Sequence, residues 1–302
     1  MKNPNDNVDA DPLRSPTPSQ AMRIAVVGLG LLGGSVARAV RDRMPDARVV
    51  GCARNEKTRQ YAMENGVVDE ATAELAAAVR GADLVVVATP VDAIAHAVIE
   101  IAAADPNTLI TDVGSTKSNI VSAVVADATA ASRFIAAHPI AGSEKTGVEH
   151  SRADLFVGRP VILTPSGFES TGAVERVADF WCSLGGNVSH MSADAHDQLL
   201  AISSHMPHLM ASLIAGQLPP EGQAIVGTGW LDTTRIAAGD PQLWTAIVGE
   251  NRTAIVNSLR SIGRELTSLI DAIETHDDSA VEEMLRSAQT IRLHAVNHES
   301  RP

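Results

Sequence analysis

The feature that most constrains the fold is a glycine-rich segment directly after a short apolar run at 23–27. The segment reads Gly28-Leu29-Gly30-Leu31-Leu32-Gly33. A continuous apolar run that ends at glycine is typical of a buried parallel strand, and a helical stretch through Arg43 follows. Between strand and helix, the G-x-G-x-x-G pattern allows a tight turn, close approach of the backbone to pyrophosphate and close helix–strand packing. The segment therefore predicts a dinucleotide site, with phosphate at the helix N-terminus.

Strand-like runs alternate with Ala-rich helical segments through the first two thirds of the chain. After the first strand, the runs lie at 48–51, 84–88, 109–113, 134–137, 161–163 and 187–191. Such alternation predicts βαβ units in a parallel sheet with right-handed crossovers. We expect an α/β domain of the Rossmann type over residues 21–192, after a polar, Pro-rich tail at 1–20 that is expected to be disordered.

Beyond residue 192 the pattern is helical only. Apolar stripes with three- and four-residue spacing run through Leu199, Ile202, Met206, Met210 and Leu213, through Ile255, Leu259, Ile262, Leu266, Leu269 and Ile273, and through Val281, Met284, Leu285, Ala288 and Ile291. Asp240 followed by Pro241 predicts an N-cap and a helix start. Wide apolar faces on a segment this small predict an all-helical domain over 193–302 that forms a homodimer with a second copy.

Composition argues against several classes of function. The net charge of −12, from 24 basic and 36 acidic residues, is unfavourable for a nucleic-acid surface, which needs clustered Lys and Arg. Cys52 and Cys182 fit no disulfide framework and no metal-binding motif, and charged residues interrupt every long apolar stretch, so no membrane span is expected. We expect a cytoplasmic protein that acts on a small molecule, with no metal, nucleic acid or membrane partner.

The end of the second strand bears on which dinucleotide binds. An NAD site usually places Asp or Glu there to bind the ribose 2′-OH, but residues 51–55 read G-C-A-R-N. Arg54 can pair with a 2′-phosphate, so we expect NADP to be preferred, or both NADP and NAD to be used; alternatively, Arg54 is only a solvated surface charge. Thr89, Pro90 and Gly114 follow two other strands and are expected to complete the cofactor site.

Four further motifs carry candidate chemistry. They are T-D-V-G-S-T-K at 111–117, H-P-I-A-G-S-E at 138–144, S-S-H-M-P-H at 203–208 and D-T-T-R at 232–235. Ligands of open α/β sheets bind at the carboxyl ends of the strands, which places Ser115 and His138 where a substrate could lie. Histidine titrates near neutral pH and can act as a general base; the alternative is a capping or core histidine before Pro139.

Together with the opening G-L-G-L-L-G-G-S, these strings resemble the prephenate/arogenate dehydrogenase family in order and spacing, over about residues 22–275. The resemblance implies an oxidoreductase of tyrosine biosynthesis. In that reaction a cyclohexadienol transfers hydride to nicotinamide while it loses carbon dioxide. The resemblance also implies that His138 is the catalytic histidine and that Ser115 forms a hydrogen bond near the same ring hydroxyl.

The substrate of this family carries carboxylates, so the chain must supply a local cation. Arg235 can bind a carboxylate through two hydrogen bonds, and the resemblance implies His205 as a second substrate contact. The resemblance also implies that Ser143, Glu144 and Asp232 lie around the substrate, with the two acids in ion pairs. The alternative for the acids is that they are ordinary surface carboxylates.

His205 and His208 are three residues apart, which could suggest a metal site. Pro207 between them and the lack of a third nearby ligand argue against zinc. Trp244 matches a family position associated with prephenate rather than arogenate, since an aromatic ring offers an ammonium group no carboxylate. The alternative is that Trp244 only packs its helix.

Two rival functions remain open. One is another dehydrogenase with Rossmann and helical domains, acting on a β-hydroxy acid or reducing an imine, which the ordered H-P-I-A-G and D-T-T-R strings argue against. The other is a nucleotide-sensing regulator without catalysis. A sensor would need none of the four residues His138, Ser115, His205 and Arg235.

Overall fold

The computed structural model describes residues 21–142 and 145–299, with side chains to residue 295. The predicted tail at 1–20 lies outside this range. The chain divides into two compact units, Met1–Arg252 and Thr253–Pro302, which are described separately below.

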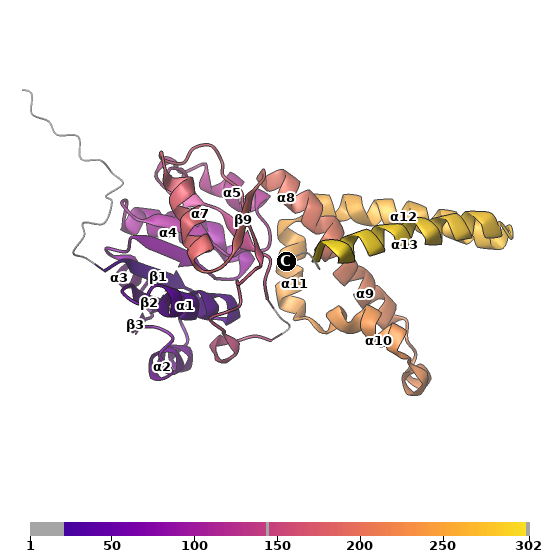
Figure 1. The fold of residues 1–302 in the computed structure, drawn as a ribbon, viewed down its shortest axis with the longest axis horizontal. Coiled ribbons are helices and arrows are strands. Elements are labelled where there is room, and N and C mark those ends of the chain that lie inside the picture. The colour runs from indigo at the N-terminus through magenta and orange to yellow at the C-terminus, as the bar shows by residue number, and fades with distance from the viewer. Residues whose placement is uncertain (1–20, 143–144, 300–302) are drawn as a thin grey trace, which may run out of the picture. The chain divides into compact units, whose positions relative to one another are not determined.

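The first unit is built on a six-stranded parallel sheet (Figure 1). The strands, in the spatial order β3-β2-β1-β4-β5-β6, are β1 (Arg23–Val27), β2 (Arg48–Cys52), β3 (Glu70–Thr72), β4 (Leu84–Val87), β5 (Leu109–Asp112) and β6 (Phe134–Ile135). Val27 pairs with Cys52 on one side and with Val87 on the other. The three strands therefore end level, and the loops that follow them share one edge of the sheet. The predicted parallel Rossmann sheet is confirmed; β3 was not predicted.

Helices cover both faces of this sheet. They are α1 (Leu31–Arg43), α2 (Glu56–Glu64), α3 (Leu75–Val79), η1 (Val91–Ala93), α4 (Ile94–Ala104), α5 (Ser118–Val124), α6 (Ala128–Ala131), η2 (Val148–His150) and α7 (Ala173–Ser183). Alternate residues of a strand point to opposite faces, so strands covered on both sides are apolar throughout. In β1, Ile24 and Val26 face one apolar cluster, while Ala25 and Val27 face the other.

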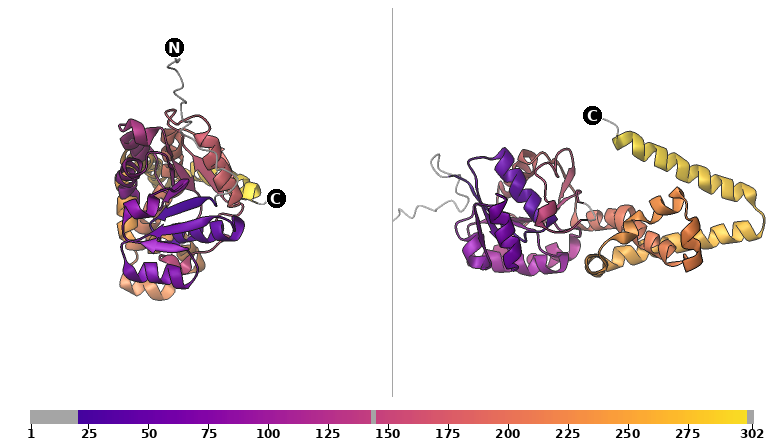
Figure 2. Two further views of the ribbon diagram at one scale, coloured as in Figure 1. Left: turned by 90° about the vertical axis from the view of Figure 1, so that its left-hand side faces the viewer. Right: turned by 90° about the horizontal axis from the view of Figure 1, so that it is seen from below.

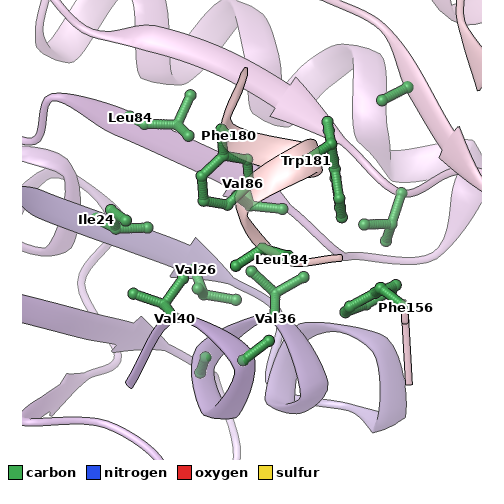
Figure 3. Packing of buried hydrophobic residues seen from close by; sticks show 14 of the residues in the cluster. Ile24, Val26, Val36, Val40, Leu84, Val86, Phe156, Phe180, Trp181 and Leu184 are labelled. Carbon is green, nitrogen blue, oxygen red and sulfur yellow. The ribbon is translucent and has the colours of Figure 1, made fainter. Parts of the chain in front are cut away.

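The first cluster lies between the sheet, α1 and α7 (Figure 3). Val36 and Val40 of α1 belong to this cluster, as does Trp181 of α7, which packs edge-on against Phe156 and Phe180 with ring centroids 5.5 and 5.4 Å apart. The second cluster contains buried residues of α3, α4 and α5. Because both faces are fixed by apolar packing, the carboxyl edge of the sheet can hold polar loops in set positions.

The run predicted as one strand at 134–137 is two strands. β6 pairs with β5, whereas β7 (Ala137–Pro139) pairs antiparallel with β8 (Pro160–Leu163) in a second sheet that β9 (Asn187–His190) completes. The cause is a side chain: Oδ1 of Asp112 accepts the backbone N–H of Ala137 at 2.9 Å. This bond replaces the next rung of the ladder with β5, so the chain turns away after Ile135.

The helical part of the first unit begins with α8 (Ala193–Leu200), η3 (Ala201–His205) and α9 (Met206–Gly216). The middle piece is a π-helical turn. Pro207 explains it, because proline has no N–H and its ring displaces the carbonyl four residues earlier. By length and composition this stretch, with a mean hydropathy of 1.3, is the one helix among the described residues that could cross a membrane. Apolar helices of proteins that never enter a membrane meet the same criterion.

Four shorter elements complete the first unit: η4 (Pro220–Ile225), α10 (Thr228–Thr234), η5 (Arg235–Ala238) and α11 (Pro241–Glu250). The predicted start of α11 is confirmed: the Asp240 side chain accepts the backbone N–H of Gln242 at 2.9 Å, with proline in the first turn.

The second unit consists of α12 (Arg252–Glu274), almost entirely, and α13 (Asp278–Glu299). The chain reverses at His276, whose φ of 57° lies in the left-handed region. Figure 2 shows α13 running back from the end of α12 and diverging from it. Apolar side chains of both helices are exposed, among them Leu266, Ile273, Leu285 and Ile291. Helices with so little apolar burial need a further surface to pack against.

Candidate active site

The glycine-rich loop between β1 and α1 has the three properties that a dinucleotide requires. Gly28 has a φ of +98°, and a Cβ there would lie 2.4 Å from the Ala88 carbonyl oxygen. A Cβ on Gly33 would lie 1.9 Å from the Gly28 carbonyl oxygen, so this glycine lets the helix pack on the loop. A Cβ on Gly30 would meet no heavy atom within 4 Å, which leaves the backbone open to a phosphate. The loop fits a dinucleotide pyrophosphate.

The loops after β4 and β5 lie at the same edge. Val87 pairs with Asp112, so these two strands also end level. The buried Oγ1 of Thr89 has no hydrogen-bond partner among the described residues, and such an atom is normally satisfied by a ligand or water. Pro90 precedes the turn η1, and the N–H of Gly114 donates to Oδ2 of Asp112 at 2.8 Å.

The loop after β2 is braced by an arginine. Nη1 of Arg59 donates to the carbonyl oxygens of Ala53 and Arg54 at 2.7 and 2.8 Å, and Asn55 caps α2. Arg54 itself is exposed and forms no ion pair with another described residue. Its guanidinium is therefore available at the position that distinguishes the two dinucleotides.

A cavity of about 570 Å³ lies beside Leu31, the first residue of α1. Four basic or titratable side chains are part of its lining: Lys145, His150, Arg152 and Arg159. An otherwise acidic chain thus has a positive cavity next to the helix end that is itself suited to anions.

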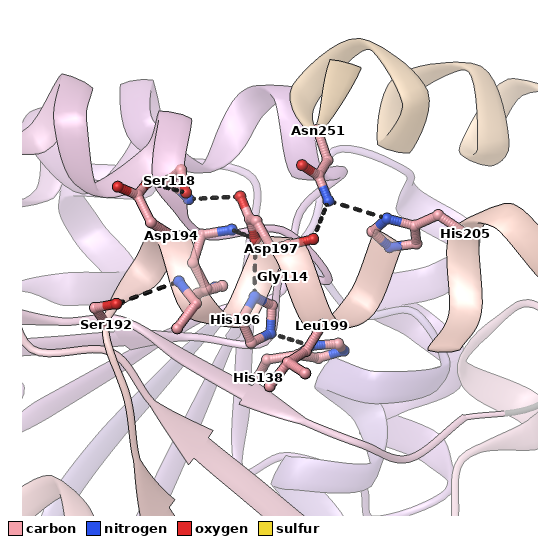
Figure 4. A network of polar contacts seen from close by, with 12 residues as sticks. Gly114, Ser118, His138, Ser192, Asp194, His196, Asp197, Leu199, His205 and Asn251 are labelled. Atoms are coloured by element: carbon pink, nitrogen blue, oxygen red, sulfur yellow. Dashed lines mark hydrogen bonds and ion pairs between the residues drawn. The ribbon is translucent and has the colours of Figure 1, made fainter. Parts of the chain in front are cut away.

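In the middle of β7, His138 begins a chain of polar contacts that runs into α8 (Figure 4). Nδ1 of His138 lies 2.8 Å from Nε2 of His196, and Nδ1 of His196 lies 2.8 Å from Oδ1 of Asp197. His196 and Asp197 are adjacent on α8 and are 0% and 3% exposed. These three residues are called the His–His–Asp triad below.

Asp197 is anchored by the backbone at the start of α5. Oδ1 accepts the N–H of Lys117 and Oδ2 accepts the N–H of Ser118, both at 2.8 Å. Burial raises the pKa of Asp197, but hydrogen bonds from His196 and from the two backbone amides outweigh burial, so the pKa lies below its usual value. The carboxylate is therefore ionised at neutral pH.

A buried ion pair ties the loop that carries Ser115 to β7. Nζ of Lys117 contacts the carboxylate of Asp112 and donates to the carbonyl oxygen of Ala137 at 2.8 Å. Both charged side chains are fully buried. Burial lowers the pKa of Lys117, and the Asp112 carboxylate opposes that shift. Half-buried Ser115 lies within the loop that this pair holds.

His138 has the properties of a base. Burial of the ring, and then the neighbouring His196, Lys117 and His205, hold its pKa well below the usual value. The imidazole is therefore neutral at neutral pH and can accept a proton from a bound ligand.

A second group of rings surrounds His205. Its Nδ1 lies 3.2 Å from Nδ2 of Asn251, which also donates to the carbonyl oxygen of Asp197 at 2.7 Å. Burial lowers the pKa of His205 to about 4. Trp244 stacks on His208, with ring centroids 3.5 Å apart and planes 14° from parallel, and meets His205 edge-on at 6.2 Å.

The structure thus brings together some predicted residues and not others. His138, the Ser115 loop and His205 are joined through the triad and its contacts. Asp232 and Arg235 are exposed at the end of α10 and the start of η5, and neither pairs with another described residue. Ser143 and Glu144 lie outside the described residues. Nor do the described residues contain a group of three or more His, Cys, Asp or Glu side chains that could hold a metal ion.

Sequence reasoning missed His196, Asp197 and Asn251. A signal existed for two of them. Ser192 is a helix N-cap, and His196 and Asp197 follow it side by side, directly before the apolar stripe that begins at Leu199. Asn251 gave no signal, because its partner Asp197 is 54 residues away.

A Rossmann sheet with a fitting phosphate loop, followed by helices that place a buried histidine network at the sheet edge, defines a nicotinamide-dependent dehydrogenase with a helical second part. The family model described as the nucleotide-binding domain of prephenate dehydrogenase matches residues 36–190, and the model of its dimerization domain matches residues 192–287. The chain belongs to the prephenate dehydrogenase family.

Similar proteins agree with this assignment. The chain is 34% identical to a cyclohexadienyl dehydrogenase of Zymomonas mobilis, over 92% of this chain and 98% of that protein. It is 31% identical to a prephenate dehydrogenase of Bacillus subtilis, over 89% of this chain and 75% of the relative. The crystal structure of prephenate dehydrogenase from A. aeolicus with hydroxyphenyl propionate and NAD+ superposes with a TM-score of 0.86 at 28% identity, over 92% of this chain and 100% of that one. The protein is an oxidoreductase that uses a nicotinamide dinucleotide.

Proposed function

We propose that this protein oxidises prephenate to 4-hydroxyphenylpyruvate in tyrosine biosynthesis, with His138 as the catalytic base. The observation that carries the proposal is a half-buried histidine that the triad holds beside the carboxyl end of β5, with its pKa lowered so that the ring is neutral. A nicotinamide dinucleotide held by the glycine-rich loop at Gly28, Gly30 and Gly33 would supply the acceptor for the hydride on the ring carbon that bears the hydroxyl. His138 accepts the hydroxyl proton. As the ring carboxylate leaves as carbon dioxide, its electron pair makes the ring aromatic, and the resulting phenolate recovers the proton.

The other substrate contacts follow from charge and position. Ser115, in the loop held by the buried Lys117–Asp112 pair, donates a hydrogen bond near the ring hydroxyl. Arg235 has an exposed guanidinium that pairs with no other described residue and is suited to a substrate carboxylate. His205 is a second contact, and Ser143, Glu144 and Asp232 surround the bound substrate.

Trp244 favours prephenate over arogenate. The stacked pair with His208 presents aromatic rings and no carboxylate, so an ammonium group gains no partner there. Arogenate is the second candidate, because one similar protein is named a cyclohexadienyl dehydrogenase rather than for a single substrate. If Trp244→Ala leaves the prephenate-to-arogenate ratio of kcat/KM unchanged, the preference has another origin.

NADP is the proposed preferred cofactor, with NAD also accepted. The support is the exposed Arg54 on a loop that Arg59 braces. In Arg54→Ala, turnover with NADP should fall by about 10-fold relative to NAD, the loss of one charge-assisted contact of about 1.5 kcal/mol. An unchanged ratio of the two rates would remove Arg54 as the discriminator.

The proposed division into a dinucleotide domain at 21–192 and a substrate and dimerisation domain at 193–302 is supported by the change from sheet to helices after His190. The exposed apolar side chains of the helices support a homodimer. They include Leu199, Ile202, Leu213, Leu285 and Ile291. A monomeric mass by light scattering at micromolar concentration would contradict the dimer. The proposed location is the cytoplasm.

The test is absorbance at 340 nm with prephenate or arogenate, each against NAD and NADP. We expect turnover with prephenate, and a fall of about 10²–10⁴-fold in kcat for His138→Asn, as for loss of a general base, with dinucleotide affinity retained. His190→Asn is the matched control, because His190 lies in another strand of the second sheet but is exposed. No turnover in any of the four mixtures, with cofactor bound, would overturn the proposed function.

A further inference from the structure

We infer that Asp197 and His196 are positioning residues that fix which ring nitrogen of His138 carries the proton, so that Nδ1 is the protonated nitrogen and Nε2 is the base. The effect on turnover rests on the proposed function. The arrangement of protons does not, since it follows from the hydrogen bonds of the triad.

Asp197 determines which atoms donate and which accept in the hydrogen bonds of the triad. An ionised carboxylate can only accept hydrogen bonds. Oδ1 and Oδ2 already accept the N–H groups of Lys117 and Ser118 at 2.8 Å each, a pair of donors that favours the ionised form. The contact of 2.8 Å between Oδ1 and Nδ1 of His196 therefore requires the hydrogen on Nδ1 of His196.

The next contact follows from the first. In the inferred arrangement His196 carries a single hydrogen, the one on Nδ1, so its Nε2 holds a lone pair and acts as an acceptor. Nδ1 of His138, 2.8 Å away, must then donate to it. This leaves Nε2 of His138 with its lone pair free for a substrate proton. The opposite tautomer would present an N–H there and could not act as the base.

The triad also supports the state after proton transfer. Once His138 holds two protons, Nδ1–H still donates to His196, and the Asp197 charge stabilises the new imidazolium through the intervening ring. The charged or titratable groups around the two rings are Lys117 and Asp112 from β5 and its loop and His205 from η3, and Asp194 lies one turn back on α8. Unlike these groups, Asp197 is joined to His138 through a hydrogen-bonded ring, that of His196.

The tautomer can be measured without turnover. In the full-length wild-type enzyme with 15N-labelled histidine and no substrate, NMR distinguishes a protonated ring nitrogen from an unprotonated one. We expect the His138 proton on Nδ1 at neutral pH. A proton on Nε2 in the wild type overturns the inference, whether or not the enzyme turns over prephenate.

His196→Leu tests the consequence, because leucine fills the space but cannot accept a hydrogen bond. The His138 proton should then move to Nε2, and kcat should fall by up to about 10⁴-fold, the loss seen when the orienting member of a catalytic triad is changed. KM should change little, since His196 is not a proposed substrate contact. If the folded variant keeps the Nδ1 proton or the wild-type kcat, His196 does not position His138.

Asp194→Asn is the matched control. Asp194 is an exposed carboxylate on the same helix, and it accepts a hydrogen bond from the Ser118 hydroxyl at 3.0 Å. It lies near α5 but takes no part in the triad, so its variant should keep both the wild-type kcat and the Nδ1 tautomer. A loss as large as that of His196→Leu would show that docking of α8 on α5, and not the triad, is responsible. Dinucleotide affinity reports in each variant that the Rossmann domain is folded.

Discussion

The phosphate loop and the His–His–Asp triad lie in the same unit but are built by different means. The loop is six consecutive residues, and what matters in it is the path of the backbone, which three glycines permit. The triad joins side chains of β7 and α8, since His138 and His196 are 58 positions apart, and backbone N–H groups at the start of α5 anchor it, since Lys117 and Asp197 are 80 positions apart. Changes in the loop should therefore act through sterics, and changes around the triad through charge and lost hydrogen bonds.

The largest effect is expected for Lys117→Met. Methionine fits the apolar part of the side chain but leaves Asp112 buried without its cation. Removing one partner of a buried pair costs about 3–5 kcal/mol of unfolding free energy. Since the N–H groups of Gly114 and Ala137 still donate to Asp112, the loss should lie near the lower end. Urea denaturation at neutral pH measures it.

Arg286→Met is the control for that variant. Arg286 pairs with Glu282 on α13, but both side chains are about 70% exposed, and exposed pairs contribute little. The midpoint of this control should barely move. If Lys117→Met changed the midpoint as little as Arg286→Met, the two backbone N–H donors alone would be enough to stabilise the buried Asp112 carboxylate. The region around the triad would then depend on backbone groups as much as the phosphate loop does.

The next effect is at the loop. In Gly33→Ala the new Cβ would lie 1.9 Å from a backbone oxygen of Gly28, which cannot rotate away as a side chain could. We expect a loss of about 1–3 kcal/mol in stability, together with weaker dinucleotide binding. Gly30→Ala should separate these effects, since its Cβ meets no protein atom within 4 Å: stability should be unchanged and only dinucleotide affinity should fall. Equal loss of stability in both variants would contradict the assigned roles.

The same comparison explains what the sequence could predict. The loop is local, so its motif, its strand and its helix were all correct from the sequence, as were the helical second half and the Asp240 cap. The break between β6 and β7 was missed, because it depends on the Asp112 side chain 25 residues earlier. His138 was proposed from its motif, but His196 and Asp197 were not, since only the folded chain places α8 against β7.

Lowering the pH should destabilise the region around the triad more than the phosphate loop, because the loop has no titratable side chain. The folded-state pKa of His205 is about 4, below the ordinary value of about 6.5. Between these values the unfolded chain binds a proton that the folded chain excludes, so the free energy of unfolding falls as the pH drops below about 6.5 and levels off near 4. From pH 7 to 5.5 the loss from His205 should be about 1 kcal/mol.

Urea midpoints at pH 7 and 5.5 measure this loss, and His205→Asn should reduce the difference between them. The His138 pKa is also lowered, so part of the pH dependence should remain in that variant. A pH response identical to the wild type would mean that His205 titrates normally in the folded protein.

The smallest expected effect is Gly239→Ala, which combines features of both regions. As at Gly33, the glycine leaves room for a neighbour: a Cβ at 239 would lie 2.7 Å from Nε1 of Trp244 and 2.9 Å from Cε1 of His208. Here, however, the neighbours are side chains that can shift, and the φ of −63° suits alanine. We expect about 1 kcal/mol or less in stability, but a change in tryptophan fluorescence and in the prephenate-to-arogenate ratio, because the stacked rings move. Gly249→Ala, where a Cβ meets nothing within 4 Å, should change neither. If Gly239→Ala lost as much stability as Gly33→Ala, the stacked side chains of Trp244 and His208 would be as unable to shift as the backbone of the phosphate loop.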